Sequence, residues 1–174
     1  ALPISGHLYA YQHYNVVPDI LTSAKGLGGG FPIGAMLAKE AWAQVFQPGT
    51  HGTTFGGNPL AATVANAVLA HLDAPLLAGV GERHALIVDQ LNAISARYDA
   101  FSAVRGTGLL IGAELAGPLR GKAKTLTNLA AEEGLIALIA GPDVLRFAPA
   151  LNIPLADIAE AFVRLDRAVA RLTR

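Results

Sequence analysis

The stretch "SAKGLGGGFPIGAM", residues 23–36, decides the fold of the first part of this 174-residue chain. The apolar-leaning segments around it, 18–24 and 32–38, have the length of strands, and the glycines between them are typical of a turn. One lysine, Lys25, stands at the junction, and residues 20–38 carry no other charge. The pattern predicts a strand, a glycine-rich loop that begins with a cation, and a second strand.

The glycines of this loop do not fit a nucleotide-binding motif. A P-loop places its lysine after the glycines, whereas Lys25 precedes them. The dinucleotide fingerprint G-x-G-x-x-G needs a third glycine where this chain has Phe31 or Ile33. A second candidate, "GTGLLIG" at 106–112, runs into an expected strand instead of a helix. A nucleotide-binding domain is therefore disfavoured.

The lone lysine suggests a different chemistry. An isolated ammonium in an apolar, glycine-lined setting loses hydration, which favours the neutral, nucleophilic amine. Such an amine condenses with an aldehyde to a Schiff base, which is how pyridoxal phosphate is held. The alternative is that the stem of Lys25 lies on apolar surface while its head stays in water.

A second segment, "HGTTFGGNP" at 51–59, supplies what a phosphate would need. Asn58 followed by Pro59 predicts a helix start, because Asn is a favoured N-cap and Pro is favoured at the first helical position. Thr53 and Thr54 stand just before it, and hydroxyls near a helix N-terminus suit a phosphate. The alternative is that the threonines serve only to cap the helix.

The rest of the chain predicts further helices and strands in two domains. Large apolar residues recur every fourth position from Leu60 to Leu72, so we expect a helix packed on several sides. The break near Asp73 and Pro75 predicts a boundary between residues 1–74 and 75–174. Beyond it we expect a helix over 76–98 with a face of Val80, Ile87, Leu91 and Ile94, one buried strand over 104–115, a helix over 120–133, strands around 135–140 and 144–151, and a final helix with Ile158, Phe162, Leu165, Val169 and Leu172 on one face.

Composition excludes several classes of function. The 13 basic and 13 acidic residues are scattered and give zero net charge, so a nucleic-acid partner is not expected and a small, anionic molecule is favoured. The absence of cysteine excludes a disulfide framework, a thiol nucleophile and thiolate metal sites, and we expect no metal. No apolar run approaches the roughly 20 residues of a membrane span, and the start lacks a signal-peptide pattern. The cytoplasm is the default location.

Four segments together resemble a known family. "PDILTSAKGLGGGFPIGAMLA" followed by "HGTTFGGNPLAA" is similar to the class III pyridoxal-phosphate aminotransferases, and "VRGTGLLIGAEL" and "EEGLIALIAGPDVLRFAPALNI" resemble the smaller domain of the same family. Within it, the acetylornithine aminotransferases are the best match. The resemblance implies an α/β fold, the C-terminal part of a fold type I pyridoxal-phosphate transferase: the end of a large, mostly parallel-sheet cofactor domain over 1–74 and a small α+β domain over 75–174.

The resemblance also implies site residues. Lys25 matches the lysine that binds pyridoxal 5'-phosphate as a Schiff base and then acts as general base. Thr54, with Thr53 beside it, matches the position that binds the cofactor phosphate across a dimer interface, so a homodimer with shared sites is expected. Arg146 matches an arginine that handles substrate carboxylates, although it also fits a surface arginine beside a strand.

The implied reaction transfers an amino group from N-acetylornithine to 2-oxoglutarate, as in arginine biosynthesis. Ornithine, 4-aminobutyrate and succinyl-diaminopimelate are alternative amino donors within the family. Family members are over twice as long, so the resemblance implies a fragment that lacks an N-terminal part with the remaining cofactor and substrate residues. A non-catalytic unit for folding or dimerisation, which retains Lys25 only by descent, is the second hypothesis.

Overall fold

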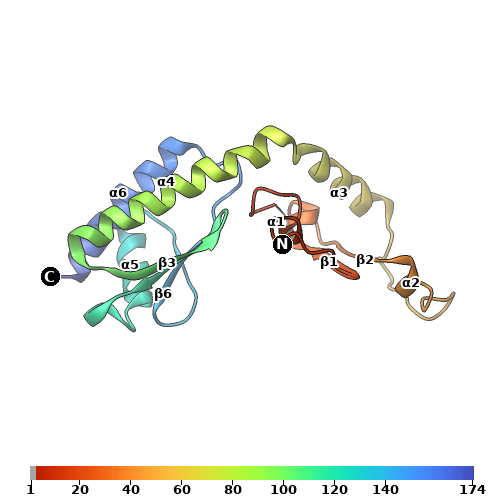
Figure 1. Cartoon of the computed structure of the whole chain (residues 1–174), viewed down its shortest axis with the longest axis horizontal. Coiled ribbons are helices and arrows are strands. Elements are labelled where there is room, and N and C mark those ends of the chain that lie inside the picture. Colours follow the sequence, from red (N-terminus) through yellow and green to blue (C-terminus); the bar gives the residue numbers. More distant parts are fainter. Residues whose placement is uncertain (1–2) are drawn as a thin grey trace. The chain divides into compact units, whose positions relative to one another are not determined.

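The structure is a computed structural model that describes residues 3–174, and it divides into two compact units. Unit 1 is formed chiefly by His7–Leu77, and unit 2 by Ile4–Gly6 together with Ala78–Arg174 (Figure 1). The assignment of residues 1–74 to a cofactor domain and of 75–174 to a small domain stays a prediction.

Unit 1 is a short strand pair with helical segments around it. Its elements are α1 (Ala10–His13), β1 (Ile20–Ala24), the 3₁₀ turn η1 (Lys25–Gly28), β2 (Gly34–Ala38), α2 (Glu40–Ala43) and α3 (Pro59–His71). The predicted strand, glycine loop and strand are confirmed, whereas α1 and α2 were not predicted. The strands pair antiparallel, with Ile20 opposite Ala38 and Ala24 opposite Gly34.

Neither sheet within residues 3–174 contains a parallel pair. The mostly parallel sheet that the resemblance implies for the large domain is therefore not formed by these residues. The connection between β1 and β2, residues 25–33, explains this locally. It is shorter than the crossover of about a dozen residues or more that parallel pairing requires.

Helix α3 begins where the sequence predicts, but its packing differs. The Oδ1 atom of Asn58 accepts a hydrogen bond from the backbone N–H of Ala61 at 2.9 Å, and Pro59 takes the first helical position. Ala61 and Ala65 are the buried residues of the helix, whereas Leu60 is 61% exposed. The expectation of packing on several sides is therefore wrong, because unit 1 provides neighbours only on the alanine side.

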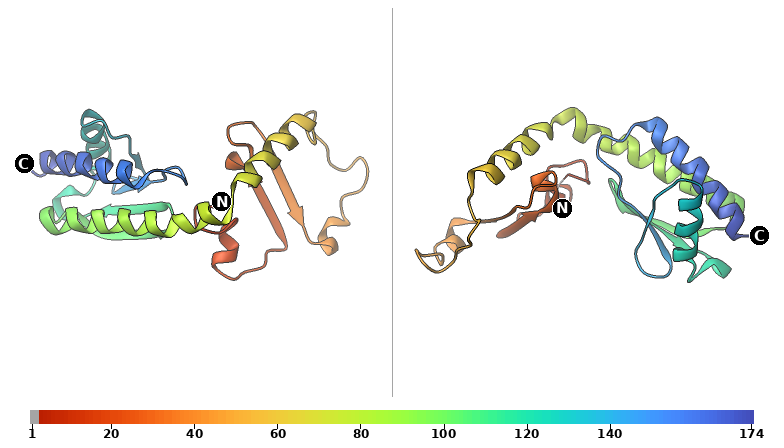
Figure 2. Two further views of the ribbon diagram at one scale, coloured as in Figure 1. Left: turned by 90° about the horizontal axis from the view of Figure 1, so that it is seen from above. Right: turned by 180° about the vertical axis from the view of Figure 1, so that it is seen from behind.

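Unit 2 is an antiparallel sheet covered by helices. It contains most of α4 (Ala74–Tyr98), then β3 (Phe101–Thr107), β4 (Leu110–Leu115), the 3₁₀ turn η2 (Gly117–Leu119), α5 (Ala123–Glu132), β5 (Leu138–Ile139), β6 (Val144–Phe147) and α6 (Leu155–Leu172). The strand order is β3-β4-β6-β5. Helices α4 and α6 lie side by side over the sheet (Figure 2).

The single strand expected over 104–115 is a hairpin instead. Strands β3 and β4 pair through Thr107 opposite Leu110, and Gly108 between them has a φ of +55°. Glycine adopts this left-handed conformation without steric cost, which permits the tight turn. The N–H of the fully buried Leu109 donates to the carbonyl of Ile4 at 2.7 Å. The apolar run thus begins in the turn, where burial of Leu109 imitates a strand pattern.

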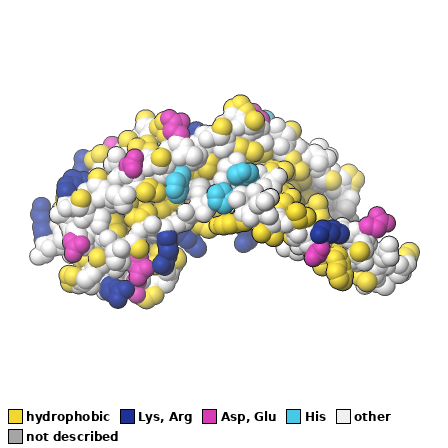
Figure 3. Space-filling model, viewed as in Figure 1, with side chains coloured by type: hydrophobic (Ala, Val, Ile, Leu, Met, Phe, Trp, Pro, Cys, Tyr) yellow, Lys and Arg dark blue, Asp and Glu magenta, His cyan; other side chains and the backbone are white. Residues whose placement is uncertain are grey.

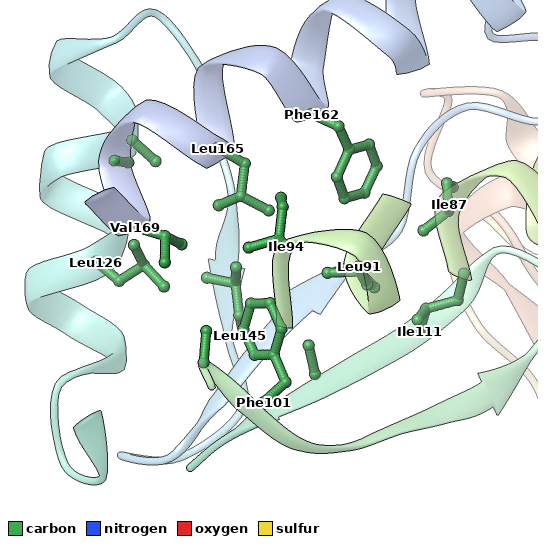
Figure 4. Packing of buried hydrophobic residues seen from close by; sticks show 14 of the residues in the cluster. Ile87, Leu91, Ile94, Phe101, Ile111, Leu126, Leu145, Phe162, Leu165 and Val169 are labelled. Carbon is green, nitrogen blue, oxygen red and sulfur yellow. The ribbon is translucent and has the colours of Figure 1, made fainter. Parts of the chain in front are cut away.

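The main hydrophobic core lies entirely in unit 2 (Figure 4). Helix α4 buries Val80, Ile87, Leu91 and Ile94, as the sequence predicts. Helix α6 buries Ile158, Phe162, Leu165 and Val169 of the predicted face, together with Ala168, while Leu172 is only partly buried. These residues pack on the sheet and on α5 through Ile111, Leu145 and Leu126.

Within residues 3–174, no single helix is long and apolar enough to cross a membrane, and α3 and α4 pass that test only when joined as a bent pair. The same residues form no group of three histidine, aspartate or glutamate side chains suited to a metal ion.

Candidate functional site

Lys25 occupies an unusual backbone position at the end of β1. Its φ is +54°, a left-handed conformation that is uncommon for residues other than glycine, asparagine and aspartate. The preceding Ala24 is extended, with φ at −157°, so the chain turns sharply at the lysine. Backbone conformations of this kind are costly and cluster at ligand and active sites. The geometry therefore marks Lys25 independently of its charge.

The ammonium of Lys25 is exposed, which differs from the burial expected from its apolar neighbours in sequence. The buried residues of the turn are Leu27 and Gly28 instead. Within residues 3–174, Lys25 forms no ion pair or side-chain hydrogen bond. Its amine is therefore accessible and free to react with an aldehyde, although unit 1 itself does not dehydrate it.

Lys39 shows the opposite arrangement. Its Nζ lies 2.7 Å from Oδ1 of Asp19, and both side chains are solvent-accessible. The hydrogen bond from Lys39, and then its charge, lowers the pKa of Asp19 below the usual value of 3.8. Asp19 precedes β1 and Lys39 follows β2, so the pair closes the open end of the strand pair. This symmetric placement is a sequence signal that the analysis above did not use.

The glycines after Lys25 allow close packing against β2 and α3. A Cβ atom on Gly28 would lie 2.8 Å from Cγ2 of Ile33, and one on Gly29 would lie 2.9 Å from Cγ2 of Val68. Both distances are shorter than real Cβ contacts allow. The glycine run thus fixes the loop that follows Lys25 against its neighbours.

Thr53 and Thr54 lie in a turn before α3, and both are exposed. Nδ2 of Asn58 donates to the carbonyl of Phe55 at 2.8 Å and closes this turn. Asn58 also provides the cap of α3, so the alternative that the threonines cap the helix is not what the structure has. The Thr54 hydroxyl makes no hydrogen bond within residues 3–174 and is open to a ligand such as a phosphate.

The described residues do not bring Lys25 into contact with Thr53 or Thr54. The loop after Lys25 packs on Val68, which lies about 13 Å along α3 from Pro59 at the helical rise of ~1.5 Å per residue. The threonines precede Pro59. A cofactor with an aldehyde and a phosphate therefore suits the chemistry of these side chains, but one copy of the chain does not gather them into one site.

Arg146 lies on β6 in unit 2, on the sheet opposite Gly112. It is exposed and lines a cavity of about 320 Å³ whose other lining residues are apolar, among them Ile87, Leu135 and Phe162. Its guanidinium forms no ion pair within residues 3–174. An unpaired guanidinium beside an apolar cavity suits a ligand that has an apolar body and a carboxylate.

Comparisons with known proteins agree with the motifs. The family described as "Aminotransferase class-III" matches residues 2–169. The chain is 68% identical over 168 residues to a succinylornithine transaminase of Photorhabdus laumondii, and 54% identical over 171 residues to an acetylornithine/succinyldiaminopimelate aminotransferase of Yersinia pestis. These alignments cover 96% and 98% of this chain, but 42% of each relative.

A solved structure gives the same result for the fold. The N-acetylornithine aminotransferase of Stenotrophomonas maltophilia is similar with a TM-score of 0.89 and 43% sequence identity, over 98% of this chain and 44% of that one. The chain thus spans about two fifths of the length of the relatives that it matches. It belongs to the class III aminotransferase family.

Proposed function

We propose that this chain provides the lysine-bearing part of an aminotransferase that moves an amino group from an N-acylated ornithine to 2-oxoglutarate. Class III aminotransferases depend on pyridoxal phosphate. When bound, this group supplies an aldehyde that takes up amines and a protonated ring that accepts electrons. The observation that carries the proposal is the free amine of Lys25, held at the end of β1 by a left-handed backbone.

Each candidate residue has one or two roles in this proposal. Nζ of Lys25 holds the cofactor by its aldehyde and serves as the base for a proton on the substrate carbon that bears the amino group. The hydroxyl of Thr54, next to that of Thr53, binds the phosphate. Because Thr54 lies apart from Lys25, it serves the site of a second subunit, and the working enzyme is a homodimer. Arg146 receives a substrate carboxylate.

N-acetylornithine is the first candidate donor, supported by the names of the Yersinia pestis and Stenotrophomonas maltophilia relatives. Succinylornithine is the second candidate, favoured by the 68% identity to the succinylornithine transaminase of Photorhabdus laumondii. Both are ornithines with an acylated amino group, and the second carries one more carboxylate. With N-acetylornithine as donor, the reaction belongs to arginine biosynthesis in the cytoplasm.

An absorbance spectrum tests the role of Lys25. The purified chain is mixed with pyridoxal phosphate and dialysed, beside Lys25→Ala and the matched variant Lys39→Ala. We expect the visible band of bound cofactor in the chain and in Lys39→Ala, and its loss in Lys25→Ala. A band of equal strength in Lys25→Ala would contradict the proposal, and no band in any of the three would favour the non-catalytic hypothesis.

Thr54 is tested by comparing a phosphorylated with an unphosphorylated cofactor. Thr54→Val keeps the shape of the side chain and removes the hydroxyl, so it should weaken retention of pyridoxal phosphate more than retention of pyridoxal. Equal losses for the two compounds would contradict a phosphate-binding role.

A further inference from the structure

The strand pair of unit 1 has two faces without a charged side chain. Directly opposite residues of an antiparallel pair point to the same face. One face therefore consists of Ile20, Thr22, Ala24, Gly34, Met36 and Ala38, and the other of Leu21, Ser23, Ala35 and Leu37. We call these residues the β1–β2 surface. Ile20, Met36 and Leu37 are each about half exposed, so large apolar side chains remain open to water on both faces.

The edges of the strand pair are open as well. Strands β1 and β2 pair only with each other within residues 3–174, which leaves one unpaired edge on each strand. A two-stranded sheet is marginally stable at best in water, and unpaired strand edges readily accept another strand. Strands that are apolar on both faces are typical of the interior of a larger sheet.

One polar atom on this surface also lacks a partner. The side chain of Ser23, on β1, is buried, and its Oγ forms no hydrogen bond within residues 3–174. Buried hydroxyls nearly always have a hydrogen-bond partner. The missing partner and the exposed apolar side chains lie on the same two strands. Figure 3 shows hydrophobic side chains gathered along the lower side of unit 1, where these strands lie.

We infer that the β1–β2 surface is an interface, and that its occupant is the complementary portion of a class III aminotransferase, which adds strands at both open edges. The relatives contain such a portion, because the alignment that covers 96% of this chain covers only 42% of the Photorhabdus laumondii protein. The high TM-score over 98% of this chain means that a complete relative keeps the same backbone here and adds to it.

A second copy of this chain is a poorer occupant. Copies that pair edge to edge would each leave another edge open, because the strand pair has two unpaired edges. Such head-to-tail pairing grows into open-ended assemblies instead of closing. The complementary portion of a relative closes both edges in one folded domain. The inference rests on the shared fold and does not require Lys25 to react.

Binding in trans tests the interface. The probe is the part of the Photorhabdus laumondii succinylornithine transaminase that this chain does not match, produced as a separate polypeptide and titrated into the labelled 174-residue chain. We expect a complex that Met36→Asp and Leu37→Asp each weaken by at least about tenfold, since a buried charge without a partner is costly. Hydrogen exchange should slow at residues 20–24 and 34–38 when the probe is added.

Two control variants make the result specific. Val163→Asp changes a side chain of similar exposure on α6, 46% against 48% for Met36, and should bind the probe like the unmodified chain. Lys25→Ala should also bind it normally, which separates a failure of this interface from a failure of the proposed chemistry. Equal weakening by Val163→Asp, or no binding by the unmodified chain, would overturn the inference. Self-association that Met36→Asp abolishes, without binding of the probe, would make a second copy the occupant and overturn it as well.

Discussion

Units 1 and 2 differ in how they treat apolar side chains. Unit 2 buries a continuous core between helices and sheet, whereas the buried apolar residues of unit 1 are Leu27, Ala61 and Ala65. Most large exposed hydrophobic residues belong to unit 1, namely Tyr14, Val16, Val17, Ile20, Met36, Leu37, Trp42, Val45, Phe46, Phe55 and Leu60. Contiguous exposed apolar surface on this scale marks an interaction site. Unit 1 is therefore built to be covered by more protein.

Charge follows the same division. Of the 13 basic and 13 acidic residues, only Asp19, Lys25, Lys39, Glu40 and Asp73 precede Leu77. Asp19 and Lys39 bind each other, which leaves Lys25 as the basic side chain of unit 1 without an ion pair in the described structure. The candidate cofactor residues thus lie in the unit with the smaller core, while Arg146 lies on the sheet of the other. The comparison implies that unit 2 supplies the stability of the isolated chain.

The largest expected effect separates the two units by their core. Leu91→Ala removes a fully buried side chain from α4 and should destabilise the chain by about 2–5 kcal/mol. Leu60→Ala makes the same change on α3, where the side chain is 61% exposed, and should cost less than about 0.5 kcal/mol. Urea unfolding of both variants, followed by far-UV circular dichroism, measures the difference. Similar losses would contradict the division into a packed and an open unit.

The next effect compares two glycines with the same backbone conformation. Gly108 in unit 2 and Gly29 in unit 1 both have a φ of +55°, so alanine costs about 1–2 kcal/mol at each from the backbone alone. At Gly108 a Cβ would overlap the carbonyl oxygen of Ile4, whereas at Gly29 it would meet a side-chain methyl of Val68. Gly108→Ala should therefore lower the unfolding midpoint more than Gly29→Ala. The reverse order would show that the loop after Lys25 is the more constrained of the two.

The smallest effect concerns the ion pair that closes the strand pair. The pKa of Asp19 is lowered in the folded state by Lys39, so its charge stabilises the fold above the unfolded-state value near 3.8. That contribution is lost as the pH falls through the lowered folded-state pKa. Asp19→Asn should slightly lower the unfolding midpoint at pH 7 and leave it unchanged at pH 2, as exposed pairs contribute little. Equal effects at both pH values would exclude a role for the charge.

The sequence predicted unit 2 better than unit 1, and the same contrast explains why. Helical periodicity reports which face is buried only when the burying partner is present, as it is for Leu91 and Phe162. On α3 the same kind of pattern placed Leu60 against protein that residues 3–174 do not contain. The hairpin turn at Gly108 was missed because Leu109 is buried in the turn and extends the apolar run.

The candidate site shows a related limit. The motifs around Lys25 and Thr54 gave the residue types, and the structure adds the left-handed backbone of Lys25 and the separation of Lys25 from Thr54. Backbone strain leaves no mark on the amino-acid pattern, because lysine is a rare residue in that conformation. The burial expected for Lys25 was inferred from sequence neighbours, whereas dehydration depends on contacts in space.

Restored amino transfer is the most direct test of the account. The chain is mixed with the unmatched part of the Photorhabdus laumondii transaminase, pyridoxal phosphate and 2-oxoglutarate, and glutamate is measured with N-acetylornithine or N-succinylornithine as donor. We predict glutamate formation by the mixture and by its Lys39→Ala counterpart, and none by either polypeptide alone or by the mixture with Lys25→Ala. Glutamate formation at the unmodified rate by the Lys25→Ala mixture would contradict the central role given to this lysine.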